Sequence, residues 1–395
     1  MNSVPLVPLG AVAVPSQRPV AVVPGQSYRT LGVKWWGEGA YERDTIDGSQ
    51  TAAATLYEVQ EDDLIINKIW VRHGSVAIAG PEIHGCAGSN EFPTFMLNRA
   101  KVLPRWIHWY TKTRDLWQKC DALSQGTSGK NRIRPERFLT IKIPLPSLPE
   151  QRRIVAKVEE LAAKVEEARG LRGEGIEETD VLHRSQVGAV YDSLLSHGRR
   201  SFGSFEPHVT SGPRSWGKHY TSAGLRFYRA QDIGPNGEIL EGAKAFVDPP
   251  DGEQGRSAFL APGDLLIVIT GATVGRCSVF TDNHEPGLVS QHVAICRLPN
   301  AEVDPAFVLW GLRSPQGQEQ LLGQRYGQGK PGLNLTNIRR IELPFPPLSD
   351  QRRIVAYLDD LEARVDSLKA LQAKTAAELD ALLPSILDKA FKGEL

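Results

Sequence analysis

Pro144–Ala156 reads PLPSLPEQRRIVA, and 200 residues later Pro344–Ala356 reads PFPPLSDQRRIVA. Nine of these thirteen positions are identical. One repeat at this distance indicates a duplicated domain, because solenoids repeat every few tens of residues. Each copy is followed by a helical pattern. The stretch therefore predicts two lobes, each of which ends in a long helix.

Further landmarks repeat upstream of this stretch at an offset of 200 or 201 residues. The segments between them have almost the same length in both halves, whereas most of their side chains differ. This pattern predicts one backbone used twice with different surfaces. The matching pairs are Tyr28-Arg29 with Tyr228-Arg229, Asp63-Leu64 with Asp264-Leu265, Gly74 with Gly275, Ser89 with Ser290, and Gly129-Lys130 with Gly329-Lys330.

The two helices are expected at residues 148–195 and 349–395. In both, apolar residues recur at alternating spacings of four and three, which is the seam of a coiled coil. In the first of them, Gly170, Gly173 and Gly175 interrupt this pattern before Val181–Leu195 resumes an apolar periodicity. At about 1.5 Å per residue, forty residues of the second helix would span about 60 Å, so it would also act as a spacer. The predicted seam residues are Ile154, Val158, Leu161, Val165, Ile354, Leu358, Leu361, Val365 and Leu368.

Composition restricts the function only weakly. The formal net charge is zero, with lobes that are slightly basic and helices that are slightly acidic, so DNA binding would depend on local patches. The four cysteines lack the spacing of a zinc site or a disulfide framework. The apolar N-terminus is broken by prolines, and no apolar run reaches the roughly 18 residues of a membrane helix. We expect a soluble cytoplasmic protein.

The first lobe contains three candidate contacts with DNA. Arg72 and His73 lie at the expected turn between strands at 63–71 and 75–79, although they could simply solvate that turn. Trp35 and Trp36 cannot both point inward from a strand, whereas Trp106, Trp109 and Tyr110 share one helix face and are expected in the core. The basic loop Gly126–Arg137 could hold phosphates or be merely solvated. The candidates in this lobe are Lys34, Trp36, Arg72, His73, Lys130, Arg132 and Arg134.

The second lobe repeats this arrangement with other side chains. A buried strand is expected to lead into a turn at Gly271 and Gly275, and the glycine-lysine loop recurs at Tyr326–Asn334 without the spacing of a phosphate-binding Walker motif. No convincing catalytic cluster is evident, so no catalytic or metal-binding residue is predicted. The candidates in this lobe are Arg214, Lys218, Arg229, Thr270, Arg276, Gln291, His292, Lys330 and Asn334.

On these residues the chain resembles the specificity subunit of type I restriction-modification systems. That family carries two target-recognition domains, with a motif like PLPPLxEQRRIV before each helical region, as at Pro144–Val155 and Pro344–Val355. Its C-terminal helix commonly ends in a sequence like LDKAFKGEL, which stands at Leu387–Leu395. The resemblance extends over nearly the whole chain.

The resemblance implies an α+β fold with two β-rich recognition domains, at 1–147 and 196–348. Two long antiparallel coiled-coil helices, at 148–195 and 349–395, would separate them, with a pseudo-two-fold relation between the halves. It implies a non-catalytic reader of double-stranded DNA, in which each lobe reads one half of a bipartite site and the helices set the spacing. Two methyltransferase (modification) subunits that bind S-adenosylmethionine would dock on the helices. Motor-nuclease (restriction) subunits that use ATP and Mg²⁺ would join them, and this chain would bind no cofactor itself.

Three alternatives stay open. The chain could be the specificity subunit of a related methylation-based phage-defence system without a classical nuclease. It could be a self-contained DNA methyltransferase, which the missing catalytic motifs disfavour, or a scaffold that binds only protein.

Overall fold

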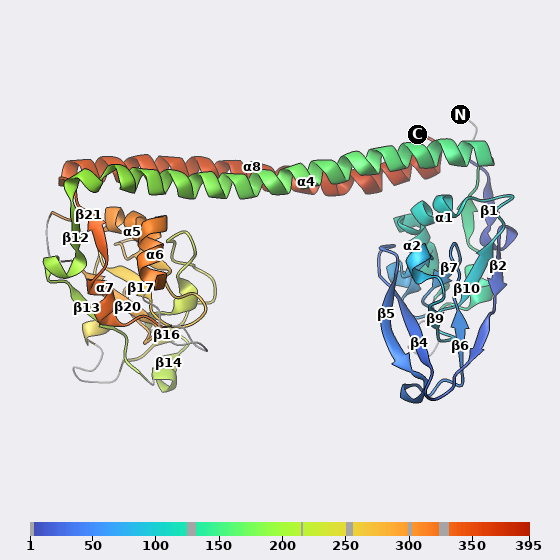
Figure 1. Cartoon of the computed structure of the whole chain (residues 1–395), viewed down its shortest axis with the longest axis horizontal. Coiled ribbons are helices and arrows are strands. Elements are labelled where there is room, and N and C mark those ends of the chain that lie inside the picture. The colour runs from blue at the N-terminus through green and yellow to red at the C-terminus, as the bar shows by residue number, and fades with distance from the viewer. Residues whose placement is uncertain (1–3, 125–131, 215, 250–255, 299–301, 324–331) are drawn as a thin grey trace. The chain divides into compact units, whose positions relative to one another are not determined.

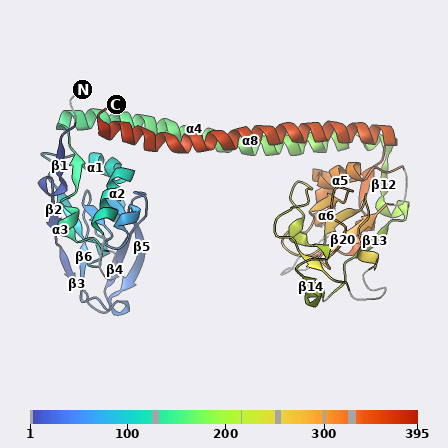
Figure 2. The ribbon, with the colours of Figure 1, turned by 180° about the vertical axis from the view of Figure 1, so that it is seen from behind.

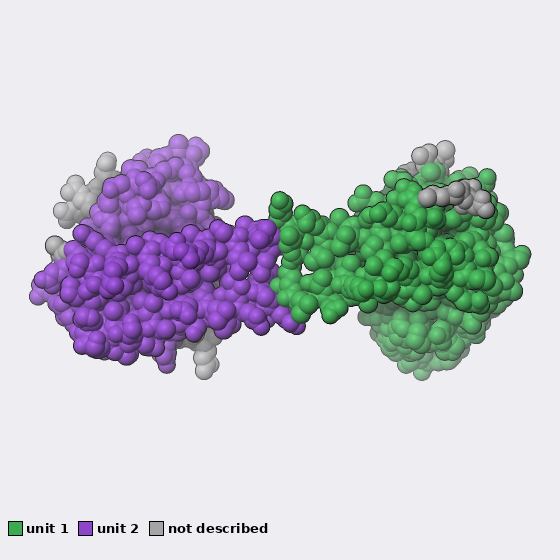
Figure 3. Space-filling model, turned by 90° about the horizontal axis from the view of Figure 1, so that it is seen from above, with its two compact units in different colours: residues 1–172, 373–395 green, residues 173–372 purple. Residues whose placement is uncertain are grey.

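The computed structural model describes residues 4–124, 132–214, 216–249, 256–298, 302–323 and 332–395. The chain forms two compact units (Figure 3). Unit 1 comprises residues 1–172 and 373–395, and unit 2 comprises residues 173–372. Each unit contains one lobe and parts of two long helices, α4 (Leu148–Ser193) and α8 (Leu348–Lys392).

The lobe of unit 1 contains three small sheets (Figure 1). One is the pair β1-β11, the second has the order β2-β10-β7-β8, and the third has the order β3-β6-β9-β4-β5. The strands are β1 (Leu6–Pro8), β2 (Ala13–Ser16), β3 (Pro19–Ala21), β4 (Ser27–Val33), β5 (Ala40–Asp47), β6 (Thr55–Glu58), β7 (Leu64–Ile66), β8 (Val76–Ile78), β9 (Ala87–Gly88), β10 (Thr94–Leu97) and β11 (Lys142–Pro144). The helices are α1 (Pro104–Thr111), α2 (Arg114–Leu123) and α3 (Pro135–Phe138).

The lobe of unit 2 also contains three small sheets. They are the pair β12-β21, a sheet β13-β20-β17-β18, and a sheet β14-β16-β15-β19. The strands are β12 (Arg199–Ser201), β13 (His208–Ser211), β14 (Tyr220–Thr221), β15 (Leu225–Tyr228), β16 (Phe246–Val247), β17 (Leu265–Val268), β18 (Cys277–Val279), β19 (Gly287–Val289), β20 (Val293–Arg297) and β21 (Glu342–Pro344). The helices are α5 (Pro305–Arg313), α6 (Pro315–Gly323) and α7 (Leu335–Arg339).

The predicted duplication of the backbone is confirmed. The sheets β2-β10-β7-β8 and β13-β20-β17-β18 are antiparallel throughout and have the same order. Each lobe also has one parallel pair, β4 with β9 and β15 with β19. The lobes differ in the third sheet, which has five strands in unit 1 and four in unit 2.

Asp63 and Asp264, one of the repeated landmarks, are buried at the same place in the two lobes. Each carboxylate accepts a hydrogen bond from the backbone N–H three residues earlier and forms an ion pair with an arginine. The arginine is Arg18 in unit 1 and Arg297 in unit 2. The repeat therefore keeps the buried carboxylate, while a different part of the chain supplies its partner.

In each unit, the segments of α4 and α8 lie side by side and run antiparallel (Figures 1 and 2). In unit 1, Arg153 donates to the Leu395 carbonyl and Arg169 forms an ion pair with Asp380. In unit 2, Lys369 forms an ion pair with Asp180 at 2.6 Å. None of the helices among the described residues is long and apolar enough to span a membrane.

The apolar seam packs most tightly where each helix meets its lobe. Ile154, Val158 and Val165 are buried in unit 1, Ile354 and Leu358 are buried in unit 2, and Leu161, Leu361 and Val365 are half-buried. The prediction for Leu368 is wrong, because its side chain is 43% exposed. Lys369 occupies the inward position instead, where its ammonium reaches Asp180.

α4 continues as one helix through Gly170, Gly173 and Gly175, the glycines that interrupt its apolar pattern. A glycine costs about 1 kcal/mol in a helix interior, which packing against a partner helix can offset. Gly170 and Gly173 are exposed, and a Cβ at either position would have no heavy atom within 4 Å. They are therefore tolerated in this helix and are not needed for a close approach.

Gly170→Ala and Gly173→Ala are each expected to raise the free energy of unfolding by about 0.5 to 1 kcal/mol. Urea denaturation followed by circular dichroism at the helical minimum would measure the change. Gly188→Ala is the matched control in the same helix, since its Cβ would lie 3.3 Å from the Pro315 ring. Equal gains at all three positions would contradict this explanation.

Gln151 and Gln351, the first identical residues of the QRRIVA half, fasten each lobe to its helix. The Gln151 side-chain oxygen accepts from Leu103 N at 2.9 Å, and its nitrogen donates to the carbonyls of Lys101 at 3.0 Å and Pro146 at 2.8 Å. Gln351 makes the same three bonds with Asp304 N, Glu302 O and Pro346 O, at 2.9, 2.9 and 2.8 Å. We call each set the glutamine clamp.

Candidate nucleic-acid interface

Four aromatic side chains gather on the surface of unit 1, between the β4–β5 turn and the 3₁₀ turn Val71–His73. Trp35 lies 5.2 Å from Trp70 and 5.4 Å from His73, measured between ring centroids. Trp36 lies 5.7 Å from His73 on the other side. Trp35, Trp36 and Trp70 are 46%, 48% and 37% exposed. We call Trp35, Trp36, Trp70 and His73 the tryptophan cluster.

The strand expected at 63–71 is shorter in the structure. As a result, part of the tryptophan cluster lies on the turn that follows the strand. β7 ends at Ile66, so Trp70, Arg72 and His73 belong to the turn before β8. Gly74 closes this turn with a φ of 71°, in the left-handed region that favours glycine. The two predicted cations therefore lie on a 3₁₀ turn and not at the tip of a tight hairpin.

Cationic groups lie beside the cluster. Lys34 is exposed, with its ammonium 6.0 Å from the centre of the Tyr41 ring. Arg72 is half-buried, and its Nε has no hydrogen-bond partner among the described atoms. Arg72, His73 and Trp36 line a pocket together with Arg114, Trp117, Gln118 and Asp121. This surface can accept an anionic group next to a flat apolar one.

Arg132 and Arg134 lie at another place on unit 1. Both are exposed, and Arg132 forms an ion pair with Glu91 at 3.2 Å. Lys68 reaches the same carboxylate oxygen at 4.0 Å, and the other oxygen of Glu91 is buried without a partner among the described atoms. Lys130 lies outside the described residues. Contact of the two arginines with DNA stays a prediction.

Thr270, Gln291 and His292 come together in unit 2. The Thr270 hydroxyl bonds His292 Nδ1, and Gln291 Nε2 lies 3.2 Å from His292 Nε2. Backbone contacts show that His292 occupies the position of Glu91. Lys68 N donates to Glu91 O and Ile133 N to Lys68 O, while Ile269 N donates to His292 O and Leu333 N to Ile269 O. The same backbone frame thus carries an acidic group in one lobe and an imidazole in the other.

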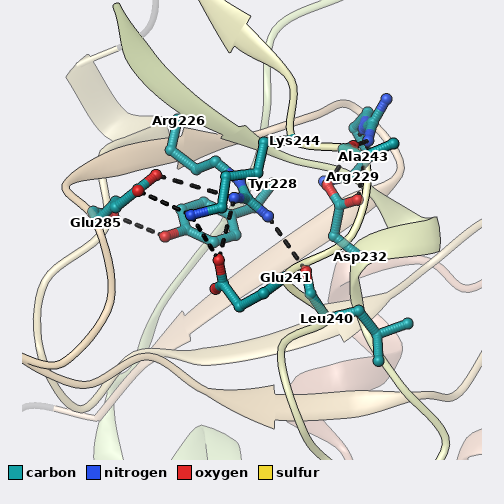
Figure 4. A network of polar contacts seen from close by, with 9 residues as sticks. All are labelled: Arg226, Tyr228, Arg229, Asp232, Leu240, Glu241, Ala243, Lys244 and Glu285. Carbon is teal, nitrogen blue, oxygen red and sulfur yellow. Dashed lines mark hydrogen bonds and ion pairs between the residues drawn. The ribbon is translucent and has the colours of Figure 1, made fainter.

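Arg229 has a structural role within unit 2. It forms an ion pair with Asp232 at 2.9 Å and donates to the Ala243 carbonyl (Figure 4). The hydrogen bond with Asp232 raises the pKa of Arg229. Because these contacts engage the guanidinium, Arg229 has less freedom to bind DNA than its sequence position suggests.

Arg226, which the sequence did not single out, is fully buried beside this pair (Figure 4). It lies 3.6 Å from Glu241 and 3.8 Å from Glu285, and it donates to the Leu240 carbonyl. Lys244 bridges the same two glutamates at 2.6 and 2.8 Å. Burial raises the pKa of the neighbouring Tyr228 to about 12. The network fastens the loop before β16 to strand β15.

The remaining candidates are dispersed. Arg214 is exposed after β13, whereas Arg276 lines a cavity that faces α4 and α8 of unit 2. Asn334 caps α7 by accepting from Thr336 N at 3.0 Å, so its oxygen is already used. Lys330 and the side chain of Lys218 lie outside what the structure describes. Within the described ranges, no three His, Cys, Asp or Glu side chains are grouped so that they could hold a metal ion.

The comparisons with known proteins agree with this architecture. The family model described as the type I restriction modification DNA specificity domain matches residues 248–376. The HsdS subunit from Thermoanaerobacter tengcongensis aligns with a TM-score of 0.61 and 25% identity, covering 99% of this chain and 97% of that one. A chain from a structure on complex assembly and conformational transition of the type I R-M system aligns at 0.74 and 25%, with coverages of 99% and 98%. The chain is thus similar to the type I restriction-modification specificity subunits over nearly its whole length.

Curated specificity subunits match over a shorter part. That of the StySPI enzyme from Salmonella potsdam is 25% identical over 311 residues, which are 74% of this chain and 66% of that protein. That of the EcoKI enzyme from Escherichia coli is 25% identical over 319 residues, with the same coverages. The match thus spans slightly less than two thirds of these relatives' own length.

In this chain, the region matched by the family model begins directly after β16 and ends within α8, at residue 376. It includes the Thr270, Gln291 and His292 group and the second glutamine clamp. The tryptophan cluster lies outside it. Sequence reasoning found Trp36 and His73 but missed Trp70 and Trp117, although the tryptophan two residues before Arg72 could have drawn attention to that turn.

Proposed function

We propose that this chain is the DNA-reading subunit of a type I restriction-modification complex, in which each lobe recognises one half of a bipartite target. The observation that carries the proposal is one backbone frame built twice with different polar groups at the same position, Glu91 in unit 1 and His292 in unit 2. Carboxylates accept from the cytosine amino group, and other side chains select other base edges. Two lobes with different readouts would give an asymmetric, split target.

The partners in this proposal are double-stranded DNA and two modification subunits, which would methylate adenine with S-adenosylmethionine. Exposed leucines on the paired helices support a docking role. Leu171 and Leu382 are 63% and 44% exposed in unit 1, and Leu182 and Leu371 are 63% and 59% exposed in unit 2. Apolar side chains at matching positions suit a partner that binds twice. Restriction subunits with ATP and Mg²⁺ would supply movement and cleavage, and this chain would contribute recognition only.

Exchange of residues 1–147 for the corresponding lobe of another specificity subunit is expected to change one half of the methylated motif and to leave the other half intact. The physical reason is that each lobe has its own core and its own clamp to a helix. Methylome sequencing of cells that express the complex would measure this. Exchange of residues 196–348 is the reciprocal control. Loss of both half-sites in either soluble, assembled hybrid would overturn the proposal of one lobe for each half-site.

A further inference from the structure

We propose that the tryptophan cluster of unit 1 is a stacking site for a DNA base that becomes unstacked when the chain binds its target. The inference rests on the proposed function, since it concerns how the first lobe contacts its half-site. In addition to reading base edges, the first lobe would then deform the DNA duplex at one base step.

The first support is the use of tryptophan in this chain. Of eight tryptophans, four are buried, namely Trp106, Trp109, Trp216 and Trp310 at 1%, 8%, 6% and 3% exposure. Trp117 is half-buried, and the three remaining ones are exposed in one place. Exposed aromatic rings that gather at one site are typical of ligand recognition, because binding removes a large apolar area from contact with water.

The second support is that the backbone holds Trp36 in place. Its φ is 57°, a left-handed conformation that bulky residues adopt only when their surroundings enforce it. Trp36 N donates to His73 O at 2.7 Å, and Gly37 N donates to Gly74 O at 2.9 Å. The Trp36 side chain is therefore presented in advance, which reduces the entropy lost on binding.

Gly37 and Lys112 hold the same turn from the other side. A Cβ on Gly37 would lie 2.5 Å from the Thr111 carbonyl oxygen, so only glycine allows this approach. Lys112 donates to the Gly37 carbonyl at 2.9 Å, and burial lowers the pKa of its ammonium. The β4–β5 turn is thus fixed to the end of α1, and Trp36 rests against Trp117 of α2 at 5.2 Å.

The charges at the rim favour DNA over an apolar protein partner. Lys34, Arg72 and Arg114 contribute three positive charges, against Glu38 and Asp121. Arg72 lines the pocket beside Trp36, where its positive charge can attract a phosphate. A base that stacks on tryptophan while its phosphate meets arginine uses both properties of this surface.

The cluster belongs to the first lobe alone among the described residues. At the offset of 201 that aligns Gly74 with Gly275, Trp70 corresponds to Gly271 and His73 to Val274. Gly271 has a φ of 103°, and no heavy atom would lie within 4 Å of a Cβ there. The deformation should therefore occur at the half-site of the first lobe and not at that of the second.

The test uses the assembled complex and duplexes with 2-aminopurine placed at each position of the two half-sites. We expect a several-fold rise in fluorescence at one position of the first half-site on binding. Trp36→Ala should remove this rise and weaken binding about 10- to 100-fold, with an unchanged salt dependence, because stacking involves no phosphate charge. Tyr357→Ala, an exposed aromatic on α8, is the matched control.

Thermal unfolding of Trp36→Ala and Trp36→Phe separates a folding defect from lost stacking, and Trp36→Phe should retain part of the fluorescence rise. The inference is overturned if wild type binds its target without a fluorescence rise, or if Trp36→Ala keeps the full rise. It is also overturned if the modification subunits alone protect the tryptophans from acrylamide quenching. If the complex still binds its target sequence specifically in any of these outcomes, only the stacking site is refuted and the proposed function stands. If sequence-specific binding is absent altogether, the proposed function itself is wrong.

Discussion

Gln351→Ala and Gln151→Ala are each expected to lower the free energy of unfolding of their unit by about 2 to 4 kcal/mol. The truncation removes three hydrogen bonds and leaves one backbone N–H and two carbonyls of the lobe junction without their partner. Gln151 and Gln351 are 0% and 1% exposed, so water cannot replace these bonds. Because the two clamps are alike, the two losses should be similar.

Urea denaturation with a separate probe for each unit would measure this, since two units need not unfold in one step. Arg352→Ala is the control, because Arg352 is the next residue of the same motif and is exposed. It should change stability by no more than about 0.5 kcal/mol. A clamp variant as stable as Arg352→Ala would show that the glutamine does not fasten the lobe.

Arg297→Met should destabilise unit 2 by about 3 kcal/mol, since it leaves the carboxylate of Asp264 buried without its countercharge. The guanidinium reaches the two oxygens at 2.6 and 2.7 Å, and the Asp264 side chain is fully buried. After the change, the bond from Ala261 N at 2.7 Å would be the one side-chain hydrogen bond that the carboxylate keeps among the described residues. Methionine retains most of the aliphatic volume of the arginine side chain, so the loss of stability measures the effect of removing the positive charge.

A double-mutant cycle with Asp264→Asn would isolate this effect. The double variant should be more stable than Arg297→Met, because the amide can still accept from Ala261 N and carries no charge. Arg214→Met, at an exposed arginine of the same unit, is the control and should be close to neutral. A stable Arg297→Met variant would mean that water reaches Asp264 in solution.

The repeated landmarks made the duplicated frame predictable, because they are the residues whose backbone role leaves little choice. Gly74 and Gly275 both have positive φ, and Asp63 and Asp264 are both buried. The arginine partners could not be predicted. Arg18 lies before its aspartate in the chain and Arg297 after it, so only the folded sheets bring each pair together.

The seam between the helices could be predicted where its residues are apolar. The prediction failed at Leu368, where a polar residue takes the inward position. A pattern of apolar residues favours Leu368 over Lys369, yet Lys369 faces the partner helix because its ammonium finds Asp180. The glycines of α4 interrupt the apolar pattern without ending the helix, because helix propensity is weak compared with packing against a second helix.

The candidate interface was predictable only in part. Trp35 and Trp36 stood out because two adjacent residues of an expected strand cannot both face the core, and the structure places both in the β4–β5 turn. Trp70 and Trp117 join them through tertiary packing of a 3₁₀ turn and a helix, for which the sequence carries no periodic signal. Arg229 and Asn334 showed the opposite limitation, since local partners engage side chains that looked available.

The composition of the units has a consequence for biosynthesis. Unit 2 is one continuous stretch, residues 173–372, whereas unit 1 needs residues 373–395. Phe391 packs against Trp106 and Tyr110 at 4.6 and 5.1 Å, and Leu387 and Ala390 are buried in the same core. The lobe that leaves the ribosome first therefore completes its core last. A nonsense codon shortly before Leu387 would remove these contacts and damage the lobe of unit 1, although that lobe is translated before unit 2.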